Sequence, residues 1–117
     1  KISEIVRKAE VIRDTIAISS YEVQENDTSL ICAKAADELL TIGNITASFV
    51  LGTMENQICI SGRSIGDINV QVILEKLGGG GHITLAGAQL EDETIESAKQ
   101  KLIEKIEEYF SEQNTMV

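Results

Sequence analysis

The sequence predicts a single α/β domain in which helices flank a small mixed β-sheet. Stretches with apolar residues at helical spacing alternate along the chain with β-branched or strictly alternating stretches, which is the pattern of interleaved helices and strands. No proline and no Ser/Gly/Pro-rich stretch divides the 117 residues into two units. With 43% hydrophobic residues, the chain can form one core of moderate size.

The first half of the chain is expected to contain two helices and two strands. Thr28 or Ser29 can cap the second helix, and Gly43 can end it. Alternating apolar and polar residues in the second strand indicate one well-buried face. In order, the expected elements are a helix over 2–13, a strand over 15–21, a helix over 28–43 and a strand over 45–51.

The second half is expected to continue with strand, helix, strand and helix. Residues 54–56 form the turn of a hairpin, Asp67 or Asn69 caps the next helix, and Gly78 closes it. The expected elements are a strand over 57–63, a short helix over 70–77, a strand over 86–90 and a long helix from 95 to 110. The domain itself is assigned to residues 15–110. Residues 1–14 are interpreted as a linker helix from an upstream domain, since the chain starts with Lys1, and 111–117 as a frayed tail.

Charge and cysteine content restrict the function. Lys and Arg number 10 against 19 Asp and Glu, a net charge of −9, which argues against a broad surface for long nucleic acids but leaves room for a small anion at a locally basic spot. Cys32 and Cys59 lack a CxxC spacing and have apolar neighbours, so they are expected to be buried free thiols of a reducing compartment. No signal peptide or membrane-spanning run is present in the sequence.

The stretch KLGGGGHITLAGAQ, residues 76–89, is the first candidate site. Each glycine is about 0.5–1 kcal/mol less favourable than alanine in regular structure, yet four are adjacent and the only histidine, His82, follows them. No Gly-Lys-Ser/Thr follows and the expected helix precedes the glycines, so the stretch is no Walker A loop. One interpretation is a flexible connector with a surface histidine. We favour the other, a loop that lets a ligand approach the main chain beside His82.

The second candidate site is Ser61-Gly62-Arg63-Ser64, where a strand ends before the next helix. Arg63 shares its strand face with Ser61, and Ser64 precedes the helix start, so a phosphate could meet a guanidinium, hydroxyls and N–H groups together. Pairing of Arg63 with surface carboxylates is an equally good interpretation. The two candidate sites bracket one helix and lie about 13 Å apart if it is straight, so a ligand with two phosphates or two bases could contact both.

Catalytic machinery is not evident in the chain. One histidine with scattered carboxylates cannot supply a cluster for one or two metal ions, and no Gly-x-Ser-x-Gly elbow or zinc spacing occurs. We therefore assign no catalytic and no metal-ligating residue to this chain.

The run INVQVILEKLGGGGHITLAGAQ, preceded by ISGRS and ASFVL, resembles the DHH-associated domain that forms the C-terminal half of DHH-family phosphoesterases. The combination of SGRS, NVQ and GGGGH is most similar to the bacterial membrane-anchored cyclic-di-AMP phosphodiesterases. The resemblance covers residues from about 15 to 110.

This resemblance implies a cytoplasmic, substrate-binding domain of a membrane-anchored enzyme that hydrolyses cyclic di-AMP to linear pApA. Manganese and the hydrolytic site would belong to a DHH domain of the same polypeptide, so the partners are that domain and a cyclic dinucleotide. The positions that match the shared cleft are Arg63, Ser64, Gly79, Gly80, Gly81 and His82. His82 would contact a phosphate or a base. The one catalytic role considered for it is a contact with the transition state.

Two alternatives stay open from the sequence. An oligoribonuclease or exonuclease relative would keep the chemistry and change the substrate. A non-catalytic RNA-binding or dimerisation module, of the type that ends alanyl-tRNA synthetases, would change the class, although the charge of −9 weighs against RNA. The sequence does not decide between adenine and guanine, or whether the chain forms a homodimer.

Overall fold

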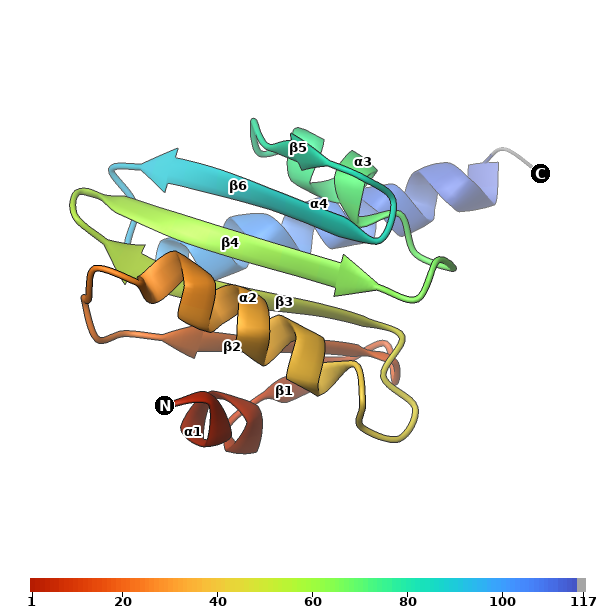
Figure 1. The fold of residues 1–117 in the computed structure, drawn as a ribbon. Helices are drawn as coiled ribbons and strands as arrows, with labels where there is room; N and C mark the ends of the chain where they lie inside the picture. The colour runs from red at the N-terminus through yellow and green to blue at the C-terminus, as the bar shows by residue number, and fades with distance from the viewer. Residues whose placement is uncertain (116–117) are drawn as a thin grey trace.

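The computed structural model describes residues 1–115, which form one mixed sheet and four helices (Figure 1). Strands lie in the order β1-β2-β3-β4-β6-β5; β2 and β3 are parallel, and every other neighbouring pair is antiparallel. The elements are α1 Ile2–Arg7, β1 Glu10–Ile12, β2 Ile16–Tyr21, α2 Thr28–Leu39, β3 Ala47–Met54, β4 Gln57–Ser64, α3 Val70–Glu75, β5 Gly80–Gly81, β6 Leu85–Glu91 and α4 Ile95–Thr115. The predicted α/β class with a mixed sheet is confirmed.

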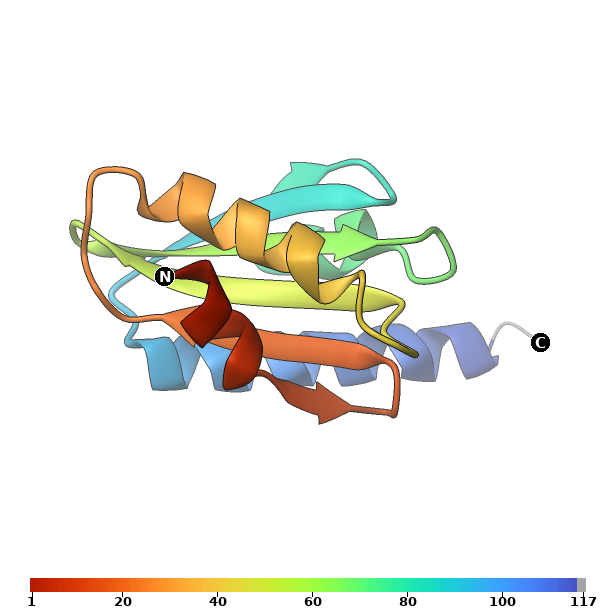
Figure 2. The ribbon, with the colours of Figure 1, turned by 60° about the horizontal axis from the view of Figure 1, so that its bottom comes forward.

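The helices lie on both faces of the sheet. Figures 1 and 2 show α1 and α2 on one face and α3 and α4 on the other. Side chains alternate between the faces: in β4, Ile58 and Ile60 belong to the core under α3 and α4, whereas Cys59 belongs to the core under α1 and α2. We call these the α3/α4 face and the α2 face.

The two faces are covered to different extents. The α3/α4 core includes residues from β2, β3, β4 and β6, and thus extends across the sheet. The α2 core contains residues of β2 and β3 and only Cys59 of β4, with none of β6. In β6, accordingly, Ala86, Ala88 and Leu90 are buried, while Leu85, at 49% exposure, and its alternate neighbours face solvent.

The expected helix over 2–13 is wrong in its second half. The helix ends at Arg7, β1 pairs antiparallel with β2, and two residues with left-handed backbone, Arg13 and Asp14 (φ 50° and 68°), form the turn between them. The physical reason is packing. Ile5 is buried in the α2 core but Ile12 packs against the α3/α4 core, and a short straight helix cannot reach both faces of the sheet.

The other helix boundaries differ in smaller ways. Helix α2 ends at Leu39, before Gly43, and its N-cap is Asp27, with neither Thr28 nor Ser29 in that position. Asn69 caps α3 as expected, because its side chain accepts a hydrogen bond from the Val72 N–H at 3.1 Å.

The C-terminal helix continues past the predicted boundary at residue 110. Its last turns are tied to the domain by ion pairs of Lys76 with Glu108 and Glu112, at 3.7 and 2.9 Å. The guanidinium of Arg13 also lies 4.0 Å from the ring centre of Phe110. The segment expected to be a frayed tail is therefore helical through Thr115, and residues 116–117 lie outside the described part of the chain.

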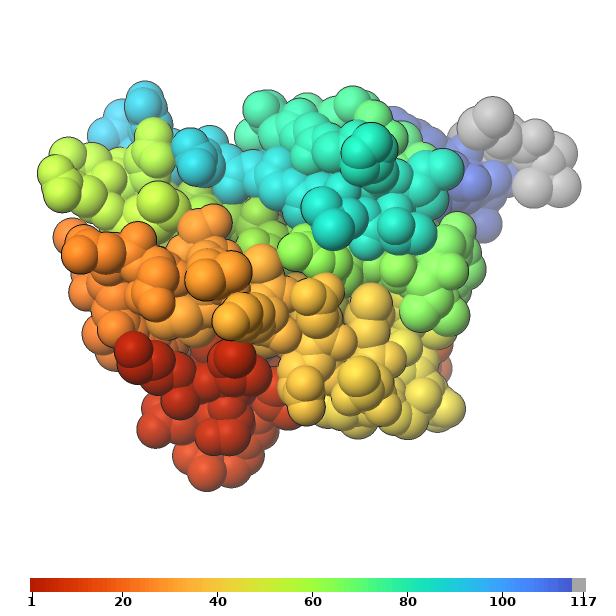
Figure 3. All heavy atoms as spheres, in the orientation of Figure 1, coloured from red at the N-terminus to blue at the C-terminus, as the bar shows by residue number. Residues whose placement is uncertain are grey.

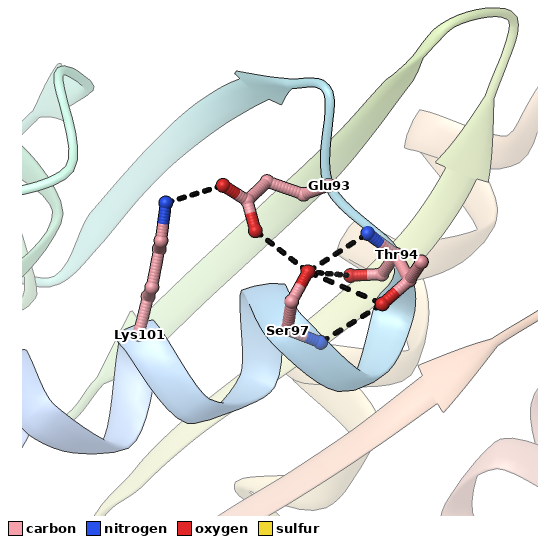
Figure 4. Close-up of polar contacts among 4 residues, drawn as sticks. All are labelled: Glu93, Thr94, Ser97 and Lys101. Atoms are coloured by element: carbon pink, nitrogen blue, oxygen red, sulfur yellow. Dashed lines mark hydrogen bonds and ion pairs between the residues drawn. The ribbon is translucent and has the colours of Figure 1, made fainter.

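The start of α4 is held by reciprocal hydrogen bonds (Figure 4). The Ser97 N–H donates to the Thr94 hydroxyl at 3.0 Å, and the Thr94 N–H donates to the Ser97 hydroxyl at 2.9 Å, a capping box with serine in place of glutamate. The Ser97 hydroxyl also donates to Glu93, which pairs with Lys101. Lys101 and then Ser97 lower the pKa of Glu93.

No helix within residues 1–115 is long and apolar enough to span a membrane.

Candidate functional site

The four glycines have separate structural roles. Gly78, with φ +85°, ends α3 in a Schellman motif: the Gly78 N–H donates to the carbonyl of Glu75 at 3.0 Å, and the Gly79 N–H donates to that of Leu74 at 2.8 Å. The helix closure predicted at Gly78 is confirmed. The chain then enters β5, which pairs with β6, so the glycines belong to a helix end and a strand.

Two of the glycines are required by close packing. A Cβ on Gly79 would lie 2.1 Å from the Gly87 carbonyl oxygen, and one on Gly81 would lie 2.4 Å from the Leu85 oxygen. Gly81 also has φ +145°, which side chains rarely allow. A Cβ on Gly80 would contact nothing within 4 Å, and the φ of Gly80 is ordinary. The fold therefore does not explain why residue 80 lacks a side chain.

Gly80 borders a groove of about 490 Å³ on the α2 face. Figure 3 shows the hollow between the atoms of α2 and those of β6, with β4 at its floor. It exists because α2 packs mainly against β3 and β4 and leaves the same face of β6 uncovered. The residues that line the groove are Ser29, Cys59, Ile60, Ser61, Gly78, Gly79, Gly80, Gly87, Ala88 and Gln89.

Strand register brings the two candidate sites together in rows across the α2 face. Gly80 is opposite Gly87, and Gly87 is opposite Ser61, which gives one row of small residues. Ser61 is 8% exposed, and its hydroxyl has no hydrogen-bond partner among the described residues.

The next row contains Arg63, Leu85 and His82. Arg63 is opposite Leu85, and the Leu85 carbonyl accepts from the His82 N–H at 2.7 Å. Two strand spacings therefore separate Arg63 from His82, about 10 Å. This is closer than the 13 Å expected from α3, because the chain folds back along β5.

Arg63 forms the carboxylate pair that the sequence left open. Its Nε donates to Asp37 of α2 at 2.9 Å and its Nη1 to the Gly62 carbonyl at 2.9 Å. The Arg63 side chain is 13% exposed, but that of Asp37 is 62% exposed. Such a partly exposed pair contributes only about 0–1 kcal/mol, so an incoming anion could replace Asp37 at little cost.

His82 and Ser64 differ in their availability. His82 is exposed at the turn between β5 and β6, and its imidazole has no hydrogen-bond or ion-pair partner within residues 1–115. Ser64 lies on the other face of β4 from Arg63, and its hydroxyl donates to the Ile83 carbonyl at 3.3 Å and accepts from the Gly66 N–H at 3.2 Å. The structure thus brings Arg63, Gly80 and His82 to one surface and uses Ser64 to hold a turn.

Sequence reasoning included Ser61 in the second candidate site but placed neither Ser29 nor Gln89 in a site. Alternation in β4 had placed Ser61 beside Arg63, and alternation in β6 places Gln89 on the same face as Gly87. Their convergence depends on the pairing of β4 with β6, which no local pattern gives. Within residues 1–115 no group of three His, Cys, Asp or Glu side chains could hold a metal ion, and the resemblance assigns manganese to the DHH domain and not to these residues.

Known proteins are similar to this chain along most of its length. Residues 13–112 match the DHHA1 domain. The chain is 43% identical over 111 residues to the cyclic-di-AMP phosphodiesterase GdpP of Geobacillus thermodenitrificans, covering 94% of the chain and 17% of the relative. It is also 43% identical over 109 residues to the cyclic-di-AMP phosphodiesterase PdeA of Listeria monocytogenes, covering 92% of the chain and 17% of the relative.

A solved structure shows the same fold at lower identity. An exopolyphosphatase-related protein of Bacteroides fragilis superposes with a TM-score of 0.77 and 22% identity, covering 92% of this chain and 33% of that one. The chain therefore spans about one sixth of the length of the phosphodiesterases it matches and about one third of this neighbour.

Proposed function

The chain belongs to the DHHA1 domain family, and from this premise we propose that it holds the substrate of a phosphodiesterase that converts cyclic di-AMP to linear pApA. In this proposal a DHH domain elsewhere in the polypeptide supplies manganese and the hydrolytic site, and the whole enzyme is anchored in a membrane with this domain in the cytoplasm. The identity of 43% to two cyclic-di-AMP phosphodiesterases supports the choice of substrate.

The observation that carries the proposal is Gly80 at the edge of the groove. Gly79 and Gly81 are small because the fold leaves no space for a Cβ, whereas Gly80 has open space around its Cα. An absent side chain that the fold does not need is explained if a ligand approaches the backbone there. The row Gly80, Gly87 and Ser61 provides a flat surface for a planar base, with the Ser61 hydroxyl free to hydrogen-bond to its edge.

Arg63 and His82 would bind the phosphates at the adjacent end of the groove. The guanidinium forms charge-assisted hydrogen bonds with phosphate oxygens once Asp37 is displaced. The exposed imidazole of His82 can donate to a phosphoryl oxygen as negative charge develops on it, which would lower the barrier of the reaction in the other domain. RNA as the ligand is disfavoured, because the net charge is −9.

Titration of the ¹⁵N-labelled chain with cyclic di-AMP, followed by two-dimensional NMR, tests this function. The method detects weak binding, which is expected because the DHH domain would contribute the rest of the site. Saturable shifts are expected at 61–63, 78–82 and 87–89. Gly80→Val should abolish them with little change in thermal stability, because its Cβ projects into open space. Arg63→Ala should weaken binding on the order of tenfold or more, the effect of losing a charge-assisted hydrogen bond.

Arg13→Ala is the matched control, since it removes an arginine–glutamate pair far from the groove. It should leave binding unchanged. Absence of saturable shifts up to millimolar ligand, or equal weakening by both arginine variants, would refute the groove as the site. Stronger binding of an RNA oligonucleotide than of cyclic di-AMP would favour the alternative module.

A further inference from the structure

The two cysteines are side by side beneath the groove. Cys32 lies on α2 and is fully buried, and Cys59 lies on β4 and is 3% exposed. A Cβ built on Gly52 of β3 would lie 2.5 Å from the Cys32 Sγ and 3.2 Å from the Cys59 Sγ. The two sulfur atoms are therefore no farther apart than the sum of those distances, and Gly52 leaves the space that both occupy.

The two thiols are not equivalent. Cys59 is one of the residues that line the groove, whereas Cys32 is covered by the helix to which it belongs. The interaction with Cys59 and then burial raise the pKa of Cys32, whereas the neighbouring Cys32 thiol lowers the pKa of Cys59. A thiol at the floor of a groove, next to a second thiol that the helix covers, is the arrangement of a reactive and a resolving cysteine.

We propose that Cys59 and Cys32 form a reversible thiol–disulfide switch at the floor of the groove, oxidised by hydroperoxides. The Cys59 thiolate attacks one peroxide oxygen, the O–O bond breaks, and sulfenic acid and hydroxide form. The Cys32 thiol then attacks the sulfenic sulfur, which forms the S–S bond and releases water after proton transfer. Overall, two thiols and one hydrogen peroxide give one disulfide and two waters.

The disulfide would act on the wall of the groove. Ser29 lies three residues before Cys32 on the same side of α2, so the two are neighbours on the helix surface, and Ser29 lines the groove opposite β6. A bond from Cys32 to Cys59 fixes this first part of α2 against β4. The switch is independent of the identity of the ligand, because it rests on the thiols alone.

Peroxide treatment of the folded chain, followed by mass spectrometry without reduction, tests the proposal. The expected result is a monomer lighter by two hydrogens, with one cross-linked peptide pair containing Cys32 and Cys59, and recovery of the original mass with dithiothreitol. NMR shifts between the two forms should include Ser29 and Ser61.

Single variants distinguish the roles of the two thiols. In Cys32→Ala, Cys59 should accumulate sulfenic acid that dimedone traps, whereas in Cys59→Ala, Cys32 should react on the order of tenfold more slowly, since the thiolate is the reactive form. Oxidation of the wild-type chain in urea is the control for access. Thiols that oxidise only in urea, or a disulfide that links two chains, would overturn the proposal, whether or not either variant folds.

Discussion

The two halves of the sheet are built from similar strands but are covered differently. Strands β2 and β3 have helices on both faces, and their residues are almost all buried. Strand β6 has α3 and α4 on one face and solvent on the other, so its burial alternates residue by residue. The open half contains the groove because α2 packs against β3 and β4 and leaves alternate residues of β6 exposed to solvent.

A substitution in β2 or β3, the strands with helices on both faces, should have the largest effect on the free energy of unfolding. Phe49 is fully buried in the α3/α4 core, so Phe49→Ala is expected to lower the free energy of unfolding by about 4 kcal/mol. Leu85 has 49% exposure on the open face, and Leu85→Ala should lower it by less than about 0.5 kcal/mol.

Urea denaturation of both variants measures these differences. Similar losses for the two variants would mean that the α2 face of β6 is covered in solution, for example by a second copy of the chain. In that case the loss for Leu85→Ala should depend on protein concentration.

The second test compares two adjacent glycines. Gly79→Ala places a methyl group against the Gly87 carbonyl and Ala88, and should lower the free energy of unfolding by about 2–3 kcal/mol. Gly80→Ala meets open space and should change it by no more than about 0.5 kcal/mol.

Thermal melts of the two alanine variants give the answer directly. Equal destabilisation would show that Gly80 is small for the sake of the fold. The absence of a side chain at residue 80 would then no longer indicate a ligand at the edge of the groove.

The smallest effect on stability is expected from a change of Glu93. This residue precedes α4, one of the two helices on the α3/α4 face (Figure 1). Lys101 and Ser97 hold its pKa below the usual 4.5, so the folded state favours the carboxylate. The resulting stabilisation is present above the usual pKa and is lost as the pH falls through the lower pKa of the folded state.

Glu93→Gln should therefore be slightly less stable than the wild-type chain at neutral pH and equal to it at pH values below the folded-state pKa. Denaturation curves at several pH values measure the difference, and Glu96→Gln, in the first turn of α4, serves as the matched control. A difference that does not change with pH would contradict the role of the charge.

Local sequence patterns identified most residues of the candidate site, but they did not predict how those residues come together in the fold. The glycine run, Arg63 and His82 stand out by composition, and alternation placed Ser61 beside Arg63. Gln89 was not predicted, because its position in the groove depends on the pairing of β6 with β4, a strand about 30 residues away in the chain. Ser64 was predicted from the sequence to contact a phosphate. In the structure it lies on the other face of β4 from Arg63 and forms hydrogen bonds within a turn.

The sequence by itself determined the α/β class, the Asn69 cap and the helix closure at Gly78, since these depend on spacing and on backbone preferences within a few residues. Two features depend on the folded structure: residues 10–12 pair with β2 in the sheet, and Gly80, unlike Gly79 and Gly81, has open space around its Cα. Both outcomes depend on contacts between segments distant in the chain. The hydrophobic periodicity of a segment specifies that a face is buried, but it does not specify which partner covers that face.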